Sequence, residues 1–255
     1  MRPRQAAEAA ESLWISGRRP VLECLRAGLP ARRLLLRAPA TGLLAELRQA
    51  ARRAGCPVEE RDNAALDRAL RHTEHRGAAL ELLPLPLQSL EETLPTLERE
   101  GERPLLLVLD GLQDPQNLGA AARCAEAAGA LALVAGRWAQ APLSDAAFRA
   151  SAGALAWLPL LTAEDLGGGL DWLGRRGYTR VGLTERAERE LFSCQVAGPL
   201  ALVLGGEGRG LSQRVRERLD LELRIPMRGR VASLNASAAA AVVLFHLTAG
   251  GAARV

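Results

Sequence analysis

Residues 105–129 read LLLVLDGLQDPQNLGAAARCAEAAG, an apolar run, a polar turn and an alanine-rich segment in succession. A short, continuously apolar run such as LLLVLD is typical of a strand buried on both faces of a sheet. In the turn, Asn117 is suited to cap the helix that the alanine-rich segment predicts, and Gly129 is suited to end it. The stretch thus predicts a strand, a loop and a helix, the unit from which parallel α/β sheets are built.

The same alternation continues on the C-terminal side of this stretch. We expect strands in LALVAG, LPLL, RVGLTE, LALVLGG and LELRIPM, and helices over 143–154, 164–177, 211–219 and 233–250. Strands that alternate with helices indicate a parallel sheet covered on both faces, so the predicted fold class is α/β. Ligands of such sheets bind beyond the C-terminal ends of the strands, which makes the loops after Leu109, Leu204 and Ile225 the first candidates for a site.

A second, smaller α/β pattern precedes this one. Its predicted strands are RRLLLR, PVEE and GAALELL, and its predicted helices are VLECLRAG, LLAELRQAARRAG and DNAALDRALR, the last capped by Asp62. Four prolines and the acidic run EETLPTLEREGER separate the two patterns. We therefore predict an N-terminal domain over 1–88, a linker with room for one short helix over 89–103, and a C-terminal domain over 104–255.

The composition excludes several classes of enzyme. The 255 residues include 33 basic side chains, and all of them are arginine. Without lysine the chain cannot form a Schiff base with a carbonyl substrate or with pyridoxal phosphate, and it cannot build a Walker phosphate loop. No apolar run is long enough for a membrane span and no apolar signal core is present, so we expect a cytoplasmic protein without a membrane partner. The four cysteines lie far apart and the three histidines form no ligand set, so no metal site is expected.

The net charge of +4 is unevenly distributed. Residues 1–90 carry fifteen arginines against ten acids, a net charge of +5, while residues 91–100 have a net charge of −3 and residues 101–255 of +2. A further cluster of arginines lies within 209–230. Basic clusters attract polyanions, although a solvated helix face accounts for them equally well. The few, scattered aromatic residues indicate no base-stacking platform.

Two further loops place small and polar residues next to an apolar strand. In LVLGGEGRGLS (202–212), four glycines let the backbone approach a ligand or adopt positive φ, and Glu207 could accept hydrogen bonds that hold the shape of the loop. A tight turn without a ligand is the alternative, and the spacing is not GxGxxG, which weakens a dinucleotide interpretation. In 224–247, Ser233 and Asn235 stand at the start of a strongly apolar helix, where they either cap it or line a site.

Taken together and in this order, three stretches closely resemble the SpoU (TrmH) branch of the SPOUT RNA methyltransferases. They are LVLDGLQDPQNLGAAARCAEAAG, LALVLGGEGRGLS and LRIPMRGRVASLNASAAAAVVLF, and RASAGALAWLPL is similar to the segment between the first two. The resemblance covers about 104–247. At the N-terminus, WISGRRPVLECLRAG and TEHRGAAL resemble the opening and the close of the family's substrate-binding extension, which is related to the ribosomal protein L30e fold.

The resemblance implies a SPOUT domain with a parallel sheet and a deep trefoil knot at its C-terminus, together with a small L30e-like α/β domain. It also implies a homodimer and S-adenosylmethionine as the methyl donor. In the family the cofactor is held by backbone groups, which correspond here to Gly205, Ile225 and Leu234, with Gly206, Pro226 and Met227 close by.

The resemblance also implies the catalytic residues. Arg123 is the candidate that activates the ribose hydroxyl, either with help from a substrate phosphate or a desolvated site, or by orienting the ribose and the phosphate. Asn117 and Glu207 are expected to hold Arg123 and the loops, and Ser233 and Asn235 to lie on the cofactor and substrate side of the knot. The chemistry requires this division of work, because a ribose hydroxyl must be aligned with the methyl group and must lose its proton.

The predicted function is methylation of a ribose 2′-hydroxyl in RNA. The predicted target is a guanosine of 23S rRNA, because the chain most resembles the bacterial enzymes that modify such a guanosine. Within the family, a tRNA or an rRNA adenosine is the alternative substrate. From other classes, a non-catalytic RNA-binding or ribosome-assembly factor keeps the same fold, and a nicotinamide-dependent oxidoreductase shares the α/β alternation.

Overall fold

The computed structural model describes residues 12–137, 143–231 and 233–249. The chain divides into two compact units, an N-terminal unit (Met1–Pro86) and a C-terminal unit (Leu87–Val255). Within the described ranges, no helix has both the length and the apolar composition needed to cross a membrane.

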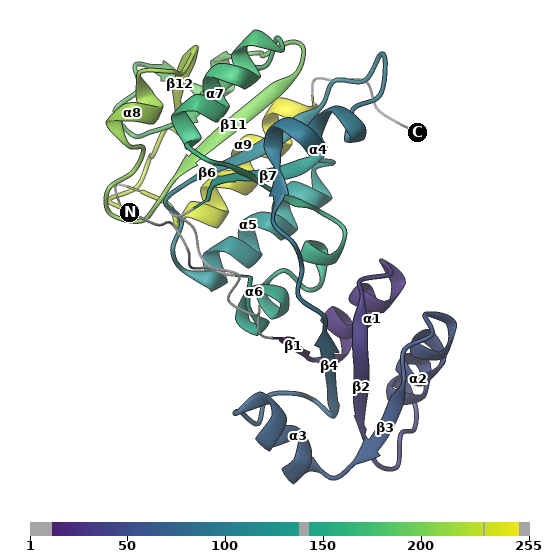
Figure 1. Cartoon of the computed structure of the whole chain (residues 1–255). Coiled ribbons are helices and arrows are strands. Elements are labelled where there is room, and N and C mark those ends of the chain that lie inside the picture. Colours follow the sequence, from purple (N-terminus) through teal and green to yellow (C-terminus); the bar gives the residue numbers. More distant parts are fainter. Residues whose placement is uncertain (1–11, 138–142, 232, 250–255) are drawn as a thin grey trace, which may run out of the picture. The chain divides into compact units, whose positions relative to one another are not determined.

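The described part of the N-terminal unit is a four-stranded sheet in the order β1-β4-β2-β3, packed with three helices (Figure 1). Strands β1 and β2 run antiparallel to β4, and β3 runs parallel to β2. The elements are β1 (Leu13–Ser16), α1 (Arg18–Arg26), β2 (Ala31–Arg37), α2 (Leu43–Arg53), β3 (Val58–Arg61), α3 (Asn63–Leu70) and β4 (Ala78–Leu82).

Local sequence explains how these elements begin and what they bury. Asp62 caps α3 as predicted, since its carboxylate accepts a hydrogen bond from the amide of Ala65 at 2.8 Å. Leu34, Leu36 and Leu80 are fully buried on the two central strands. Burying side chains of this size stabilises a fold by about 1.5–3 kcal/mol each, so the unit has a core of its own.

The C-terminal unit is built on a parallel sheet of eight described strands, in the order β10-β12-β9-β11-β6-β7-β8-β5 (Figure 1). The α/β class and the parallel sheet predicted from the alternating pattern are confirmed. The strands are β5 (Gln88–Ser89), β6 (Leu105–Asp110), β7 (Ala132–Gly136), β8 (Leu160–Ala163), β9 (Thr179–Leu183), β10 (Arg189–Glu190), β11 (Leu200–Gly205) and β12 (Leu221–Arg224).

Helices cover both faces of this sheet. Alternate side chains of a strand point to opposite faces, and Leu106 and Leu107 are both fully buried on β6. Helices α4, α7 and α8 complete the core on the face of Leu106, while α5 packs against α6 and α9. The helices are α4 (Leu90–Leu97), α5 (Pro115–Ala127), α6 (Asp145–Ala150), α7 (Leu166–Arg175), α8 (Gln213–Arg216) and α9 (Ala236–Ala249), with short 3-10 turns η1 (Ala154–Ala156) and η2 (Leu191–Ser193).

The segment 89–103 holds one short helix, α4, which is preceded by β5. Because β5 pairs with β8 and α4 packs on β8 and α7, this segment is part of the C-terminal unit. Tyr178 donates a hydrogen bond to Glu98 just after α4, and Arg176 forms an ion pair with the same carboxylate. The segment is therefore fastened to the larger unit.

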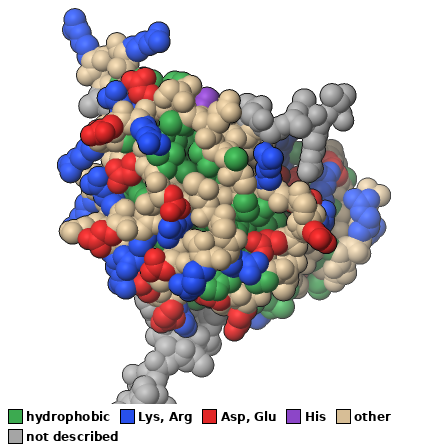
Figure 2. All heavy atoms as spheres, turned by 90° about the horizontal axis from the view of Figure 1, so that it is seen from above, with side chains coloured by type: hydrophobic (Ala, Val, Ile, Leu, Met, Phe, Trp, Pro, Cys, Tyr) green, Lys and Arg blue, Asp and Glu red, His purple; other side chains and the backbone are tan. Residues whose placement is uncertain are grey.

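Most arginines of the cluster at 209–230 are neutralised by acids. Figure 2 shows one face of the molecule, on which basic and acidic side chains are interspersed with small apolar areas. In the cluster, ion pairs form between Arg214 and Asp165, Arg216 and Glu222, Arg218 and Asp171, and Arg224 and Glu190. These four arginines are therefore part of a solvated surface on which their charge is paired, and they do not form an unpaired basic cluster.

Candidate active site

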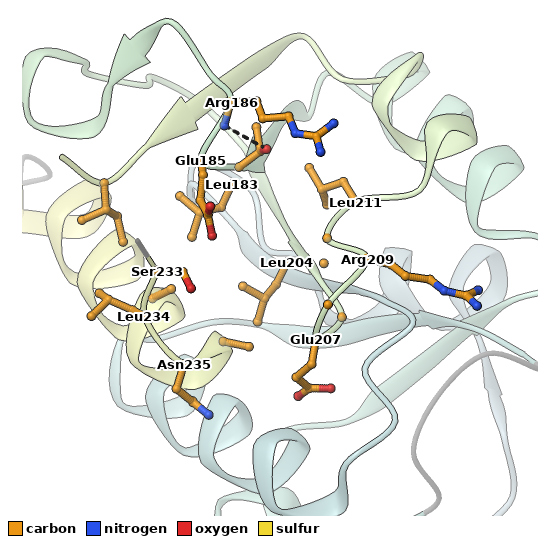
Figure 3. A pocket seen from close by; sticks show the side chains of 18 of the residues that line it. Leu183, Glu185, Arg186, Leu204, Glu207, Arg209, Leu211, Ser233, Leu234 and Asn235 are labelled. Atoms are coloured by element: carbon orange, nitrogen blue, oxygen red, sulfur yellow. Dashed lines mark hydrogen bonds between the residues drawn. The ribbon is translucent and has the colours of Figure 1, made fainter. Parts of the chain in front are cut away.

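The C-terminal ends of β9, β11 and β12 open onto one cavity of about 550 Å³. Most predicted cofactor residues line it, namely Gly205, Gly206, Ile225, Leu234 and Met227, together with the predicted catalytic residues Glu207, Ser233 and Asn235. In Figure 3 the segment 233–235 forms one wall of the cavity, Leu204 lies at its centre, and the glycine loop after β11 forms the opposite wall. The structure thus brings together two of the three loops that the sequence singled out.

Two glycines are required where the glycine loop leaves β11. A Cβ atom on Gly206 would lie 2.4 Å from the carbonyl oxygen of Gly111, and one on Gly205 would lie 2.3 Å from the carbonyl carbon of Gly210. Gly208, by contrast, stands in open space and adopts a φ of 79°. The first pair of glycines therefore permits close backbone packing, and Gly208 permits the turn.

Asp110, at the end of β6, holds both ends of the glycine loop. Its carbonyl oxygen accepts a hydrogen bond from the amide of Gly206 at 2.9 Å, and its carboxylate accepts one from the amide of Ser212 at 2.6 Å. One residue of the neighbouring strand thus fixes the entry and the exit of the loop that forms a wall of the cavity. Asp110 was not among the predicted site residues.

The third predicted loop meets the other two through Asn117. Asp114 is the N-cap of α5, because its carboxylate accepts a hydrogen bond from the amide of Gln116. The prediction that Asn117 caps this helix is therefore wrong. The side chain of Asn117 is instead free to donate to Glu207 and to accept a hydrogen bond from Asn235 at 2.9 Å.

Asn235 combines both roles that the sequence left open. Its side-chain oxygen accepts hydrogen bonds from the amide and the hydroxyl of Ser237 at 2.9 and 2.6 Å, and its carbonyl accepts one from the amide of Ala239. It thus caps α9 while it also lines the cavity. Two consecutive side-chain hydrogen bonds, Glu207–Asn117 and Asn117–Asn235, thus connect the glycine loop, the start of α5 and the start of α9.

Three predicted residues lie outside the described lining of the cavity: Asn117, Arg123 and Pro226. Arg123 is exposed on α5, six residues beyond Asn117, which places it about 9 Å further along the helix axis. The next residue, Cys124, contacts the carbonyl of Ser237 on α9. Burial raises the pKa of the Cys124 thiol, and the nearby positive charge of Arg123 opposes that shift.

The loop after β9 also lines the cavity, although it was not among the three loops predicted from the sequence. Thr184, Glu185 and Arg186 belong to this loop, and the amide of Arg186 donates a hydrogen bond to the hydroxyl of Thr184 (Figure 3). The available signal was the apolar strand that precedes the loop. Its position beside β11 depends on the strand order, which the sequence pattern does not reveal.

In the described part of the chain, no group of three or more histidine, cysteine or acidic side chains is arranged to hold a metal ion. All four cysteines are free. Burial raises the pKa of the Cys24 thiol to about 12, which leaves it uncharged near neutral pH.

Comparison with known families gives two matches. Residues 104–245 match the model of the SpoU rRNA methylase family, and residues 14–88 match the model described as RNA 2′-O ribose methyltransferase substrate binding. The first match covers more than half of the chain.

Individual relatives agree with these models. An uncharacterized tRNA/rRNA methyltransferase of Mycobacterium sp. (strain KMS) is 37% identical over 246 residues, which are 96% of this chain and 78% of that protein. A 23S rRNA (guanosine-2′-O-)-methyltransferase of Pseudomonas putida is 39% identical over 175 residues, 68% of this chain and 69% of that protein. Among solved structures, the SpoU methyltransferase AviRb of Streptomyces viridochromogenes in complex with AdoMet has a TM-score of 0.78 and 26% identity, and the match covers 94% and 91% of the two chains.

Proposed function

The chain belongs to the SpoU rRNA methylase family, and from this premise we propose that it methylates the ribose of a guanosine in 23S rRNA. The family and its methyl donor define the activity as an S-adenosylmethionine-dependent RNA 2′-O-ribose methyltransferase. The Pseudomonas putida relative, which carries that guanosine activity in its name, supports the narrower substrate. A tRNA or an rRNA adenosine is the competing substrate within the family.

One observation carries the proposal: three segments, the glycine loop, the segment 233–235 and the start of α5, are joined through Asn117 beside one cavity. The first two of these segments line the cavity, and Asn117 ties the third to both. An S-adenosylmethionine site needs a concave pocket that combines apolar surface with polar groups to orient the ligand, and this cavity has both.

The residues of the cavity fit this cofactor. Leu204, Ile225 and Leu234 offer apolar surface for an adenine ring, and the segments around Gly205 and Leu234 offer backbone donors and acceptors. The volume of about 550 Å³ is in the range that encloses a ligand of this size. We assign cofactor binding to Gly205, Ile225 and Leu234, with Gly206, Pro226 and Met227 beside them.

The chemistry requires alignment and removal of one proton. When bound, S-adenosylmethionine supplies a methyl group on a positively charged sulfur. The ribose 2′-oxygen forms its bond to the methyl carbon while the carbon–sulfur bond breaks, its electron pair stays on sulfur, and the hydroxyl proton passes to a base. Ser233 and Asn235, which line the cavity, orient the hydroxyl and the cofactor, and Asn117 and Glu207 keep the two walls in register.

Arg123 acts on the substrate through its charge. An arginine side chain keeps its proton at neutral pH, because its pKa lies above about 12. We therefore assign Arg123 to a bidentate contact with the phosphate next to the target ribose, and that phosphate helps to draw the proton from the hydroxyl. Asn117 and Glu207 fix the helix from which Arg123 projects.

We propose that the protein works as a homodimer in which Arg123 of one protomer serves the cavity of the other. The position of Arg123 outside the described lining of its own cavity supports this arrangement. The exposed apolar side chains of Phe192 on η2 and Phe245 on α9, which are 56% and 50% exposed, support a partner that covers these two neighbouring elements. His246 stacks edge-on against Phe192 and continues this surface.

We also propose a deep trefoil knot in the C-terminal unit and a cytoplasmic location. The order of the last strands supports the knot, since β12 pairs with β9 and not with β11, and α9 then returns to pack on α5. The bacterial relatives support this location, because the rRNA of a bacterial cell lies in its cytoplasm.

The test is methyl transfer to 23S rRNA that lacks the modification. The full chain is incubated with labelled S-adenosylmethionine and this RNA, and the product is digested with alkali. A ribose methylated on its 2′-oxygen cannot attack the adjacent phosphate, so the label is expected in an alkali-stable dinucleotide that begins with guanosine.

Label in a dinucleotide that begins with adenosine, or transfer to tRNA alone, would replace the proposed substrate with one of the two family alternatives. Label that alkali releases in a mononucleotide would contradict ribose methylation altogether. Equilibrium binding of S-adenosylmethionine, measured in parallel, separates a wrong RNA from an inactive preparation.

A further inference from the structure

The described arginines of the N-terminal unit fall into two groups. Five of them form ion pairs with five glutamates, Glu23, Glu46, Glu59, Glu60 and Glu81. The other group has no carboxylate within ion-pair distance among the described residues, and it includes Arg18, Arg19, Arg37 and Arg76. The positive charge of this unit is therefore concentrated in the second group.

These four arginines gather at one edge of the sheet. Because β4 runs antiparallel to β1 and β2, and β3 runs parallel to β2, the C-terminal ends of β1, β2 and β3 lie beside the start of β4. Two of the arginines follow β1, one ends β2 and one precedes β4. We call this group, Arg18, Arg19, Arg37 and Arg76, the arginine edge.

Hydrogen bonds connect the segments of the arginine edge. The side chain of Arg18 donates to the carbonyl of Arg76 at 3.1 Å, and the amide of Arg37 donates to the carbonyl of Gly77 at 2.9 Å. His75, which is buried, accepts a hydrogen bond from the amide of Gly77 at 2.9 Å and contacts Asp67 at 3.0 Å. The loop that carries Arg76 is thus held against the ends of β1 and β2.

Two aspartates at α3, the helix that precedes this loop, are already engaged. Asp62 caps α3 and Asp67 contacts His75, so neither is paired with the arginine edge. Arg19, Arg37 and Arg76 are exposed. A surface with several arginines and no paired acid attracts an anion with repeated charges.

We propose that the arginine edge is the surface through which the N-terminal unit holds the phosphate backbone of the RNA substrate. The inference rests on the proposed function and adds the contact surface to it. Planar guanidinium groups match phosphate oxygens in pairs, and spaced guanidinium groups suit the spaced charges of a nucleic acid. The aromatic side chain of Trp14 is covered by Arg33, so this unit holds RNA by charge and not by base stacking there.

The test compares two double variants of the full chain that lose the same charge. Arg19→Gln with Arg37→Gln removes two exposed arginines from the edge. Arg52→Gln with Arg53→Gln removes two exposed arginines from the end of α2, which precedes β3 and so lies at the opposite end of the sheet. Affinity for an unmodified 23S rRNA transcript is measured over a range of salt concentrations, and affinity for S-adenosylmethionine is measured in parallel.

The edge variant is expected to bind the transcript at least about tenfold more weakly, with a salt dependence reduced by roughly 1.4–1.8 in logarithmic slope, since each of the two lost phosphate contacts removes about 0.7–0.9. The control variant is expected to stay within about twofold of the wild type, and both variants to bind S-adenosylmethionine normally. Circular dichroism melting checks that both fold.

Equal weakening in the two double variants, or no weakening in the edge variant, would overturn the arginine edge while the methyl-transfer assay leaves the proposed function standing. A wild-type chain that neither binds nor methylates any RNA would overturn both.

Discussion

Asn117 on α5 donates a hydrogen bond to Glu207 in the glycine loop, which lies ninety residues later in the chain. The bond joins the helix that carries Arg123 to one wall of the cavity, and Asn235 extends it to the opposite wall. Relative movement of the two walls would misalign the sulfur, the methyl carbon and the ribose oxygen, so we regard this bond as a positioning device.

Replacing Asn117 by alanine should therefore reduce kcat for methyl transfer about 100-fold, the cost expected when reacting groups are misplaced by about 1 Å. The dissociation constant for S-adenosylmethionine should change less than kcat. In a double-mutant cycle with Glu207→Ala, the two substitutions should be coupled by about 0.5–3 kcal/mol. Strictly additive effects on kcat would show that the two residues act separately.

The glycines of the cavity give a second prediction. Gly206→Ala places a methyl group 2.4 Å from the carbonyl oxygen of Gly111, a backbone atom that cannot rotate away. We expect a loss of at least about 2 kcal/mol in the free energy of unfolding, as in overpacked cores, and weaker binding of S-adenosylmethionine. Gly229→Ala is the matched control, because a Cβ atom there meets nothing within 4 Å and should change stability by less than about 0.5 kcal/mol. Denaturant unfolding compares the two, and equal effects would contradict the packing argument.

Asp110 allows a conservative test of how the glycine loop is held. Asp110→Ala removes the acceptor of the solvent-exposed Ser212 amide, and the loss of one such hydrogen bond costs about 0.5–1.5 kcal/mol. We expect the affinity for S-adenosylmethionine to fall about tenfold while the melting of the N-terminal unit stays unchanged. Asp110→Asn keeps an acceptor oxygen at the same place and should restore most of the affinity. If asparagine were as damaging as alanine, the charge of Asp110 and not its hydrogen bond would be the cause.

Much of this architecture was predictable from the sequence, and the failures have physical reasons. Buried parallel strands such as β6 and β11 are continuous apolar runs bounded by turn residues, so their pattern alone identifies them. Asp114 and Asn117 both have side chains of a type that caps helices, so residue type alone does not decide which of them caps α5. The deciding signal was Pro115, which is favoured at the first position of a helix and so points to the residue before it as the cap.

Other features depend on contacts between distant segments. Helix α8 covers only Gln213–Arg216, shorter than the predicted 211–219, because apolar spacing does not report where a turn of helix stops. The contribution of Thr184 and Glu185 to the cavity follows from the pairing of β9 with β11, and the role of Asp110 follows from the pairing of β6 with β11. No local pattern encodes either pairing.

Tyr178 is the single tyrosine of the chain, which makes its ionisation directly observable. Burial, followed by the hydrogen bond to Glu98 at 2.6 Å, raises the pKa of Tyr178 well above its usual value of about 10. Above about pH 10 the unfolded chain therefore releases a proton that the folded chain retains, so stability is fully present below that pH and declines as pH rises further.

In the folded protein, the near-ultraviolet absorbance of tyrosinate should be missing at pH 10–11, and it should appear at about pH 10 once urea unfolds the chain. The buried thiol of Cys24 adds to the alkaline loss of stability with the same sign, so Tyr178→Phe is the control that isolates the tyrosine. Half ionisation of Tyr178 near pH 10 in the folded state would contradict its burial.

The proposal that two protomers share each site is tested most directly at Arg123. Arg123→Ala should abolish most methyl transfer while S-adenosylmethionine binding is retained, because Arg123 lies outside the described lining of the cavity. Asn235→Ala should also abolish transfer, because it removes a polar side chain from the wall of the cavity.

If Arg123 serves the partner's cavity, a heterodimer of the two variants contains one intact site, made of Arg123 from one protomer and Asn235 from the other. Mixing the unfolded variants and refolding them together should then recover about a quarter of wild-type activity, since about half of the dimers are mixed and each has one site of two. If every site took both residues from one protomer, each mixed dimer would hold two defective sites, and the refolded mixture would be no more active than its parents.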